Sequence, residues 1–149
     1  MKLGALEAGG TKMVCAVGNE DGRILDRFVI PTTTPEETVP PMIDYFKKAG
    51  IEALGIACFG PIDPDPHSAS YGYILKTPKL SWQNYPIVRT FEEALGIPAG
   101  FDTDVNGSLL GEAHFGAARG LRNAVYYTIG TGIGAGIMNP QGSAPHLLP

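Results

Sequence analysis

The sequence predicts an α/β fold with a mixed sheet flanked by helices, and two observations carry this prediction. Short apolar runs at 2–7, 12–18 and 23–30, separated by glycine- and asparagine-containing turns, are typical of three antiparallel strands. After residue 33, segments with apolar residues at helical spacing alternate with short apolar runs. The chain has 149 residues, of which 44% are hydrophobic, so it is long enough to bury one core.

Residues 34–50 are typical of a helix. Thr34 precedes a proline and two glutamates, which is a helix-start pattern with proline at the first helical position, and a glycine ends the segment. Pro40 and Pro41 fall inside it, so the helix either begins late or bends there. The apolar run at 52–58 predicts a buried strand.

The rest of the chain alternates loops with short elements. Three prolines between residues 61 and 66 exclude helix and sheet interior, and loop character continues through Trp82. The patterns that follow predict a helix over 87–95, a strand over 98–102, a helix over roughly 105–118 capped by Asp104, two strands over 123–129 and 133–138, and an irregular tail over 139–149.

Charge and hydropathy exclude several classes of protein. The 11 Lys and Arg and 15 Asp and Glu give a net charge of -4 without basic clusters, so we expect no nucleic-acid partner. No stretch approaches the roughly 20 apolar residues of a membrane span, and Glu7 interrupts any signal-peptide core, which favours a cytoplasmic protein without a membrane partner. Cys15 and Cys58 lie in apolar runs and are expected to be buried free thiols, and the three histidines lack metal-ligand spacing.

The turn after the first strand has the composition of a phosphate loop. Glu7, Gly9, Gly10, Thr11 and Lys12 combine a carboxylate, two glycines, a hydroxyl and an ammonium at one tip. Glycines leave backbone N–H groups free to face an anion, and the threonine hydroxyl adds a hydrogen bond. An ordinary tight hairpin with exposed polar residues explains the same pattern, because Gly-Gly is a favoured hairpin turn.

A second glycine-rich tip lies at 128–136. Glycine at every other position of a strand weakens it, which predicts that a ligand or another backbone approaches closely. The stretch also matches G-x-G-x-x-G/A, so an NAD(P)-binding protein is an alternative. That alternative requires the glycines to open a helix and an acidic residue about 20 positions later, and the sequence provides neither.

Asp104 stands where a strand is expected to give way to a helix. A carboxylate at the carboxyl end of a strand is placed to accept a proton from a substrate hydroxyl. The same position also suits a plain N-cap. The local pattern leaves both readings open.

Taken in order, these motifs resemble the N-terminal half of bacterial sugar kinases of the repressor/open-reading-frame/kinase (ROK) family. Glu7, where many members have Asp, and Thr103, where glucokinases tend to have Asn, favour the fructokinase branch. The resembling segments are Glu-Ala-Gly-Gly-Thr-Lys (7–12), Phe-Gly-Pro-Ile-Asp (59–63), Thr-Pro-Lys with Trp (77–82), Thr-Asp-Val-Asn (103–106), Leu-Gly-Glu (110–112), Phe-Gly-Ala-Ala-Arg-Gly (115–120) and Thr-Ile-Gly-Thr-Gly-Ile-Gly-Ala-Gly (128–136).

The resemblance implies an actin- and hexokinase-like (ribonuclease H-like) fold with two lobes and a cleft between them. Residues 1–119 would form the N-terminal lobe, 120–138 the opening hairpin of the second lobe and 139–149 the irregular tail. The implied activity is ATP-dependent phosphorylation of a hexose, fructose to fructose 6-phosphate, with Mg²⁺. Family members are about twice as long, so the chain resembles a truncated, weakly active or inactive half, and a zinc site would belong only to the missing C-terminal half.

The resemblance also assigns roles to residues. Asp104 would be the general base and Glu7 would act at the Mg²⁺, through phosphate or water. Gly9, Gly10, Thr11 and Lys12 would hold the phosphates from one side and Gly130, Thr131 and Gly132 from the other, while Gly60, Pro61, Lys79, Trp82 and Thr103 would border the sugar together with Asp104. We expect a homodimer with small-molecule sugar and nucleotide ligands. A sugar-responsive transcriptional regulator of the same family is an alternative, but only six residues precede Glu7, too few for a DNA-binding domain.

Overall fold

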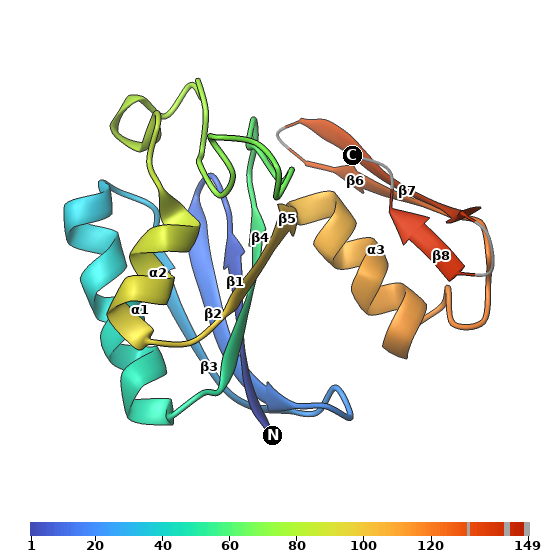
Figure 1. The fold of residues 1–149 in the computed structure, drawn as a ribbon, viewed down its shortest axis with the longest axis horizontal. Coiled ribbons are helices and arrows are strands. Elements are labelled where there is room, and N and C mark those ends of the chain that lie inside the picture. The colour runs from blue at the N-terminus through green and yellow to red at the C-terminus, as the bar shows by residue number, and fades with distance from the viewer. Residues whose placement is uncertain (131, 142–143, 148–149) are drawn as a thin grey trace.

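The computed structural model describes residues 1–130, 132–141 and 144–147, which form two sheets and three helices (Figure 1). A five-stranded sheet has the order β3-β2-β1-β4-β5 and a three-stranded sheet the order β6-β7-β8. The elements are β1 (Lys2–Ala8), β2 (Lys12–Asn19), β3 (Ile24–Pro31), α1 (Pro35–Ala49), β4 (Ala53–Cys58), a 3₁₀ turn (Leu80–Trp82), α2 (Ile87–Leu95), β5 (Ala99–Thr103), α3 (Asp104–Phe115), β6 (Ala124–Ile129), β7 (Ile133–Gln141) and β8 (Ala144–Leu147).

The first sheet is mixed, as predicted. β1, β2 and β3 form an antiparallel meander, whereas β4 runs parallel to β1 and β5 runs parallel to β4. The carboxyl ends of β1, β4 and β5 therefore lie at the same end of the sheet, which faces the top of Figure 1. The predicted α/β class is confirmed.

Helix α1 begins at Pro35 and continues through Pro40 and Pro41. The two prolines lack the N–H groups that would bond to the carbonyls of Glu36 and Glu37, and these two residues are exposed, so water can satisfy the carbonyls. The helix therefore does not begin late. Its predicted start is confirmed, although the Thr34 side chain makes no capping hydrogen bond.

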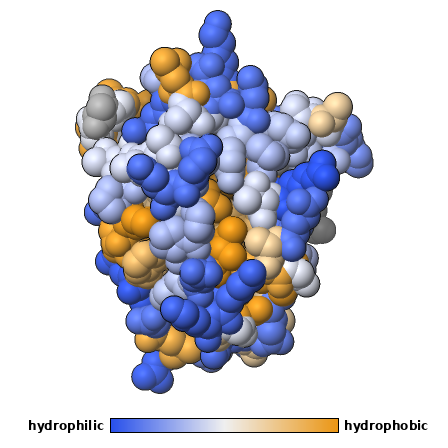
Figure 2. Space-filling model, turned by 90° about the vertical axis from the view of Figure 1, so that its left-hand side faces the viewer, coloured by the Kyte–Doolittle hydropathy of each residue, from blue (hydrophilic) through white to orange (hydrophobic). Residues whose placement is uncertain are grey.

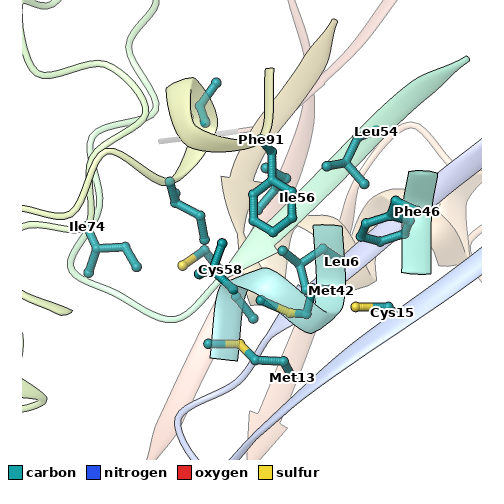
Figure 3. Packing of buried hydrophobic residues seen from close by; sticks show 14 of the residues in the cluster. Leu6, Met13, Cys15, Met42, Phe46, Leu54, Ile56, Cys58, Ile74 and Phe91 are labelled. Atoms are coloured by element: carbon teal, nitrogen blue, oxygen red, sulfur yellow. The ribbon is translucent and has the colours of Figure 1, made fainter. Parts of the chain in front are cut away.

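One face of the first sheet is covered by α1 and α2, and the core lies between the sheet and these two helices. Phe46 of α1 and Phe91 of α2 are fully buried and meet edge to face with ring centroids 6.2 Å apart (Figure 3). A buried phenylalanine stabilises a fold by about 1.5–3 kcal/mol relative to an exposed one. Cys15 and Cys58 are buried free thiols, as predicted, and burial raises the pKa of Cys15 to about 12. On the outer side of this layer, hydrophilic side chains lie around a few apolar ones (Figure 2).

The opposite face of the sheet is lined by small residues and carries α3. A Cβ atom added to Gly107 of α3 would lie 2.6 Å from the Cβ of Ala57 on β4. Ordinary carbon–carbon contacts are about 3.5–4.0 Å, so only a glycine at 107 permits this approach. Helix α3 is thereby fixed directly on the end of β4.

The second sheet packs on the other side of α3 (Figure 1). A Cβ atom on Gly136 of β7 would lie 2.8 Å from the carbonyl oxygen of Val105, and one on Gly134 would lie 3.0 Å from a methyl of the same residue. The alternating glycines therefore admit the first turn of α3, which is the close approach of a backbone that the sequence predicts. Because the glycines lead into strand β7 rather than a helix, the NAD(P)-binding alternative is wrong.

The chain beyond residue 138 differs from the predicted irregular tail. β7 extends to Gln141, and β8 pairs with it antiparallel from Met138 to Gln141. Prolines are tolerated here because β8 is an edge strand and because the pairing of β7 with β6 ends at Met138, before Pro140. Among the helices of the described chain, none has the length and apolar composition needed to cross a membrane.

Candidate active site

A cavity of about 530 Å³ lies between α3 and the small-residue face of the first sheet. Three carboxylates line it: Glu7 from β1, Asp102 from β5 and Asp104 from α3. The parallel strands bring Glu7 and Asp104 together from positions almost 100 residues apart. Within residues 1–130, 132–141 and 144–147, no cluster of three or more Asp, Glu, His or Cys is arranged to hold a metal ion.

Asp104 is the first residue of α3, and its neighbour Thr103 is the N-cap. The Thr103 Oγ1 accepts a hydrogen bond from the Asn106 backbone N–H at 3.2 Å, whereas the Asp104 Oδ1 accepts one from the adjacent Val105 N–H at 2.9 Å. The reading of Asp104 as a plain N-cap is therefore wrong. Because Thr103 caps the helix, the Asp104 carboxylate is left to line the cavity.

Cys58 lies at the end of β4, close enough to Asp104 to be affected by its charge. Burial, with a smaller contribution from the negative charge of Asp104, raises the pKa of the Cys58 thiol. The thiol is protonated at neutral pH and is an uncharged neighbour of the carboxylate.

Asp102 and Asn106 hold the strand–helix junction together, a role that the sequence alone does not predict for either residue. The Asn106 Nδ2 donates to the Asp102 Oδ1 at 2.9 Å, and only 4% of Asn106 is exposed. A Cβ atom on Gly136 would lie 3.0 Å from the Asn106 Oδ1, so this side chain lies between β5 and β7. Asn106 belongs to the Thr-Asp-Val-Asn segment (103–106) that carries the family resemblance, but the sequence does not reveal that its side chain is buried.

The tip of the first hairpin is held by three backbone-directed hydrogen bonds. The Gly9 N–H donates to the Lys12 carbonyl at 3.1 Å, the Thr32 N–H donates to the Thr11 carbonyl at 3.0 Å, and the Thr32 hydroxyl donates to the Gly9 carbonyl at 2.7 Å. A Cβ atom on Gly9 would lie 2.6 Å from the Lys12 carbonyl oxygen, so the turn requires glycine. Gly10 is exposed at this ordered tip, as are the side chains of Thr11 and Lys12.

The loop after β4 carries Gly60 and Pro61, which are joined by a cis peptide bond and are exposed. Both ends of this segment are anchored: the Phe59 N–H donates to the Ala8 carbonyl and the Leu75 N–H to the Pro61 carbonyl, each at 2.8 Å. The loop therefore starts directly beside the end of β1.

Asp63 organises the rest of this loop, a role that the sequence alone does not predict. The hydroxyls of Ser68 and Ser70 both donate to its Oδ2, and the Asp65 N–H donates to its Oδ1 at 3.1 Å. These hydrogen bonds, chiefly that from Ser68, hold the pKa of Asp63 below its ordinary value. A short stretch of Asp, Ser and Pro indicates a loop, but it does not indicate which carboxylate accepts the hydrogen bonds that hold the loop together.

Trp82 lies in the core, and this corrects its expected place as a sugar contact. Its side chain is fully buried, with its Nε1 donating to the Thr33 carbonyl at 2.7 Å and its ring edge to face with Phe59 at 6.2 Å. A fully buried indole cannot touch a ligand. Trp82 instead supports the loop that contains Gly60 through its contact with Phe59. Lys79, three positions earlier, is half-buried.

The second glycine-rich tip is exposed at the turn between β6 and β7. The Gly130 N–H donates to the Gly132 carbonyl at 2.9 Å, and both glycines are exposed. Figure 1 shows this tip at the same end of the molecule as the carboxyl ends of β1 and β4. Thr131, the third residue assigned to this tip, lies outside the described residues.

Most of the chain matches one known protein family. The sequence profile of the ROK family matches residues 3–143. The chain belongs to the ROK family. It is 54% identical over 134 residues to a protein named putative fructokinase from Bacillus subtilis (strain 168), and 48% identical over 139 residues to a fructokinase from Pediococcus pentosaceus. These matches cover 90% and 93% of this chain but 45% and 48% of the relatives, so the chain spans about half the length of the curated relatives it matches.

Solved structures of ROK proteins share the fold. A ROK family glucokinase from Streptomyces griseus, solved in complex with glucose and AMPPNP, superposes with a TM-score of 0.75 at 30% identity. The match covers 93% of this chain and 45% of the glucokinase. The actin- and hexokinase-like fold predicted from the resemblance is confirmed.

Proposed function

We propose that this ROK chain binds a hexose and Mg-ATP and transfers the γ-phosphoryl group to the sugar, with fructose as substrate and fructose 6-phosphate as product. The observation that carries the proposal is the position of Asp104. Because Thr103 serves as the N-cap of α3, the Asp104 carboxylate is not used as a cap and lines the same cavity as Glu7. The identity of about 50% to fructokinases supports fructose as the sugar.

In this proposal Asp104 is the general base. It accepts the proton of the C6 hydroxyl while that oxygen attacks the γ-phosphorus, and the bond from the γ-phosphorus to the bridging oxygen breaks to release ADP. Phosphoryl transfer needs mainly positioning and charge stabilisation, with one base to accept the proton. The hydrogen bond from the Val105 N–H orients one Asp104 oxygen and leaves the other available.

Glu7 and the tip at 9–12 suit ATP and Mg²⁺. Mg²⁺ prefers carboxylate and phosphate oxygens and keeps several of its waters, which fits a single carboxylate such as Glu7 at the end of β1 better than an all-protein cage. When bound, the ion would neutralise charge that develops on the phosphates. The exposed tip offers the Thr11 hydroxyl and the Lys12 ammonium to the same groups, and Gly130 and Gly132 would face them from the second tip.

The sugar would lie against the exposed Gly60–Pro61 segment, beside Thr103 and Asp104. On the strength of the family resemblance, we also assign residues 1–119 to the N-terminal lobe and the hairpin at 120–138 to the start of the second lobe. The net charge of -4 without basic clusters disfavours the alternative of a DNA-binding regulator.

The test is a titration of the chain with Mg-ATP and fructose beside a coupled assay of ADP release. We expect both ligands to bind, with slow turnover because the matched fructokinases are about twice as long. Asp104→Asn should reduce turnover by about 10²–10⁴-fold, the usual contribution of a general base. Asp44→Asn is the matched control, since Asp44 is an exposed carboxylate on α1. Absence of binding, or equal loss in both variants, would contradict the proposal.

We also propose that the protein is a cytoplasmic homodimer. The outer face of the second sheet is apolar and exposed, which supports association through this face. Its exposed residues are Val125, Tyr127 and Ile129 of β6 and Ile133 and Ile137 of β7, each between 42% and 79% exposed. Sedimentation equilibrium should show a dimer that Tyr127→Lys converts to a monomer, and a wild-type monomer at high concentration would refute this association.

A further inference from the structure

Lys79 belongs to the connection between β4 and α2 that also carries Gly60, and its side chain lies against the tip of the first hairpin. Its Cε is 3.5 Å from the position that a Cβ atom of Gly10 would occupy, which is ordinary van der Waals distance. We propose that Lys79 binds the phosphate groups of the nucleotide and not the sugar. The inference deepens the proposed function and rests on it.

The segment that carries Lys79 is fixed to the tip by two linked hydrogen bonds. The Trp82 Nε1 donates to the Thr33 carbonyl, and the hydroxyl of the neighbouring Thr32 donates to the Gly9 carbonyl, each at 2.7 Å. The first bond connects the 3₁₀ turn to the segment after β3, and the second connects that segment to the tip. Lys79 is therefore carried to Gly10 by packing that involves a fully buried indole.

The backbone on both sides of Lys79 is also ordered. The Trp82 N–H donates to the Lys79 carbonyl at 2.9 Å, which closes the 3₁₀ turn. On the other side, the Lys79 N–H donates to the Thr77 Oγ1 at 3.4 Å, and the Gln83 Nε2 donates to the Thr77 carbonyl at 2.7 Å. A side chain that starts from such a backbone loses less conformational freedom when it binds a ligand.

Among the described residues, no carboxylate forms an ion pair with Lys79. Across the part of the chain that the structure describes, the ion pairs are Met1–Glu20 and Arg89–Glu93, and neither includes Lys79. A half-buried lysine without a carboxylate partner among the described residues gains most from an anion of high charge, and a polyphosphate is such an anion whereas a neutral sugar is not. The Lys12 side chain, exposed at the same tip, adds a second cation.

The role that follows is electrostatic. Lys79 would donate N–H hydrogen bonds to phosphate oxygens and reduce their repulsion toward the incoming sugar oxygen. It would form no covalent bond and transfer no proton. A cation placed in advance where charge develops lowers the barrier without reorganisation.

Titration calorimetry of two Lys79 variants tests the assignment. Lys79→Gln removes the charge and should weaken Mg-ATP binding by about 10- to 100-fold, the range for a hydrogen bond to a charged group, while fructose affinity stays within about twofold. Lys79→Arg keeps the charge and should restore part of the Mg-ATP affinity. Lys76→Gln is the matched control, since Lys76 is an exposed lysine of the same loop. A loss of fructose affinity with unchanged Mg-ATP affinity would overturn the inference.

A second readout separates this inference from the proposed function. After reductive methylation with ¹³C-formaldehyde, the Lys79 signal, assigned by its absence in Lys79→Gln, should shift with Mg-ATP or inorganic phosphate and not with fructose. If that shift occurs without phosphoryl transfer, the inference holds and the proposed function fails. If transfer occurs and Lys79→Gln keeps its Mg-ATP affinity, the inference fails alone. A Lys79 signal that responds to neither phosphate compound also overturns it.

Discussion

The contact between α3 and β4 predicts the effect of one methyl group close to the candidate base. A Cβ atom on Gly107 would lie 2.6 Å from the Ala57 Cβ and 3.7 Å from its Cα. Since carbon atoms pack at about 3.5–4.0 Å, Gly107→Ala must move α3 about 1 Å away from the sheet. Gly111 on the same helix has no atom within 4 Å of its Cβ position, so Gly111→Ala is a control without this contact.

The two substitutions separate packing from helix propensity. Alanine in place of glycine stabilises a helix by about 1 kcal/mol, and this gain applies to both positions. Overpacking costs about 1–3 kcal/mol, and this cost applies only to position 107. Urea unfolding should therefore show Gly107→Ala to be less stable than Gly111→Ala by about 1–3 kcal/mol.

The same displacement should reduce turnover, because Gly107 is three residues from Asp104. A misplacement of about 1 Å at a reacting group can cost about 100-fold in rate. We expect kcat to fall in Gly107→Ala with little change in the KM for ATP, and to be unchanged in Gly111→Ala. Equal unfolding free energies and equal kcat values for the two variants would refute the reasoning.

Three further predictions follow from other contacts. Trp82→Phe removes a buried hydrogen bond and should lower the unfolding free energy by about 1–3 kcal/mol in urea, whereas Leu80→Ala, 78% exposed, should change it by less than about 0.5 kcal/mol. Serine hydroxyls hold the pKa of Asp63 below its ordinary 3.8. The stability that these hydrogen bonds give the folded loop is therefore complete above pH 3.8 and is lost as the pH falls through the pKa of Asp63 in the folded protein. The protection of the loop amides against hydrogen exchange should then fall below about pH 4, and Asp63→Asn should abolish this dependence. Gly136→Ala should clash with the Val105 carbonyl and lower the unfolding free energy by about 1–3 kcal/mol, and an unchanged thermal midpoint would contradict it.

Local patterns predicted the elements of the fold well. The antiparallel strands at the start and the helices at 35–49 and 87–95 follow from turn residues, spacing and stop signals that lie within a few positions of each element. The alternating glycines at 134 and 136 also predicted a close approach correctly. Identifying the approaching backbone as α3 required the tertiary structure.

Other features depend on contacts between distant segments. Thr103 and Asp104 are both good capping residues, and only the backbone geometry shows that Thr103 caps and Asp104 faces the cavity. The local sequence places Trp82 in a loop. Its burial depends on a distant segment, because the carbonyl of Thr33, 49 positions earlier, accepts its hydrogen bond. Strand β8 was missed because the prolines after residue 138 suggested an irregular tail, although Pro145 lies on an edge strand and Pro140 lies beyond the pairing of β7 with β6.

The parallel pairing of β1 with β4 and of β4 with β5 has a consequence for the order of folding. β1, β2 and β3 pair through short turns, whereas β5 reaches the sheet about 100 residues after β1. Contacts between distant segments form slowly because long loops must close first. We therefore expect the hairpin bearing Glu7 to form early and the junction bearing Asp104 to dock late, so that refolding should restore far-ultraviolet circular dichroism before it restores ligand binding.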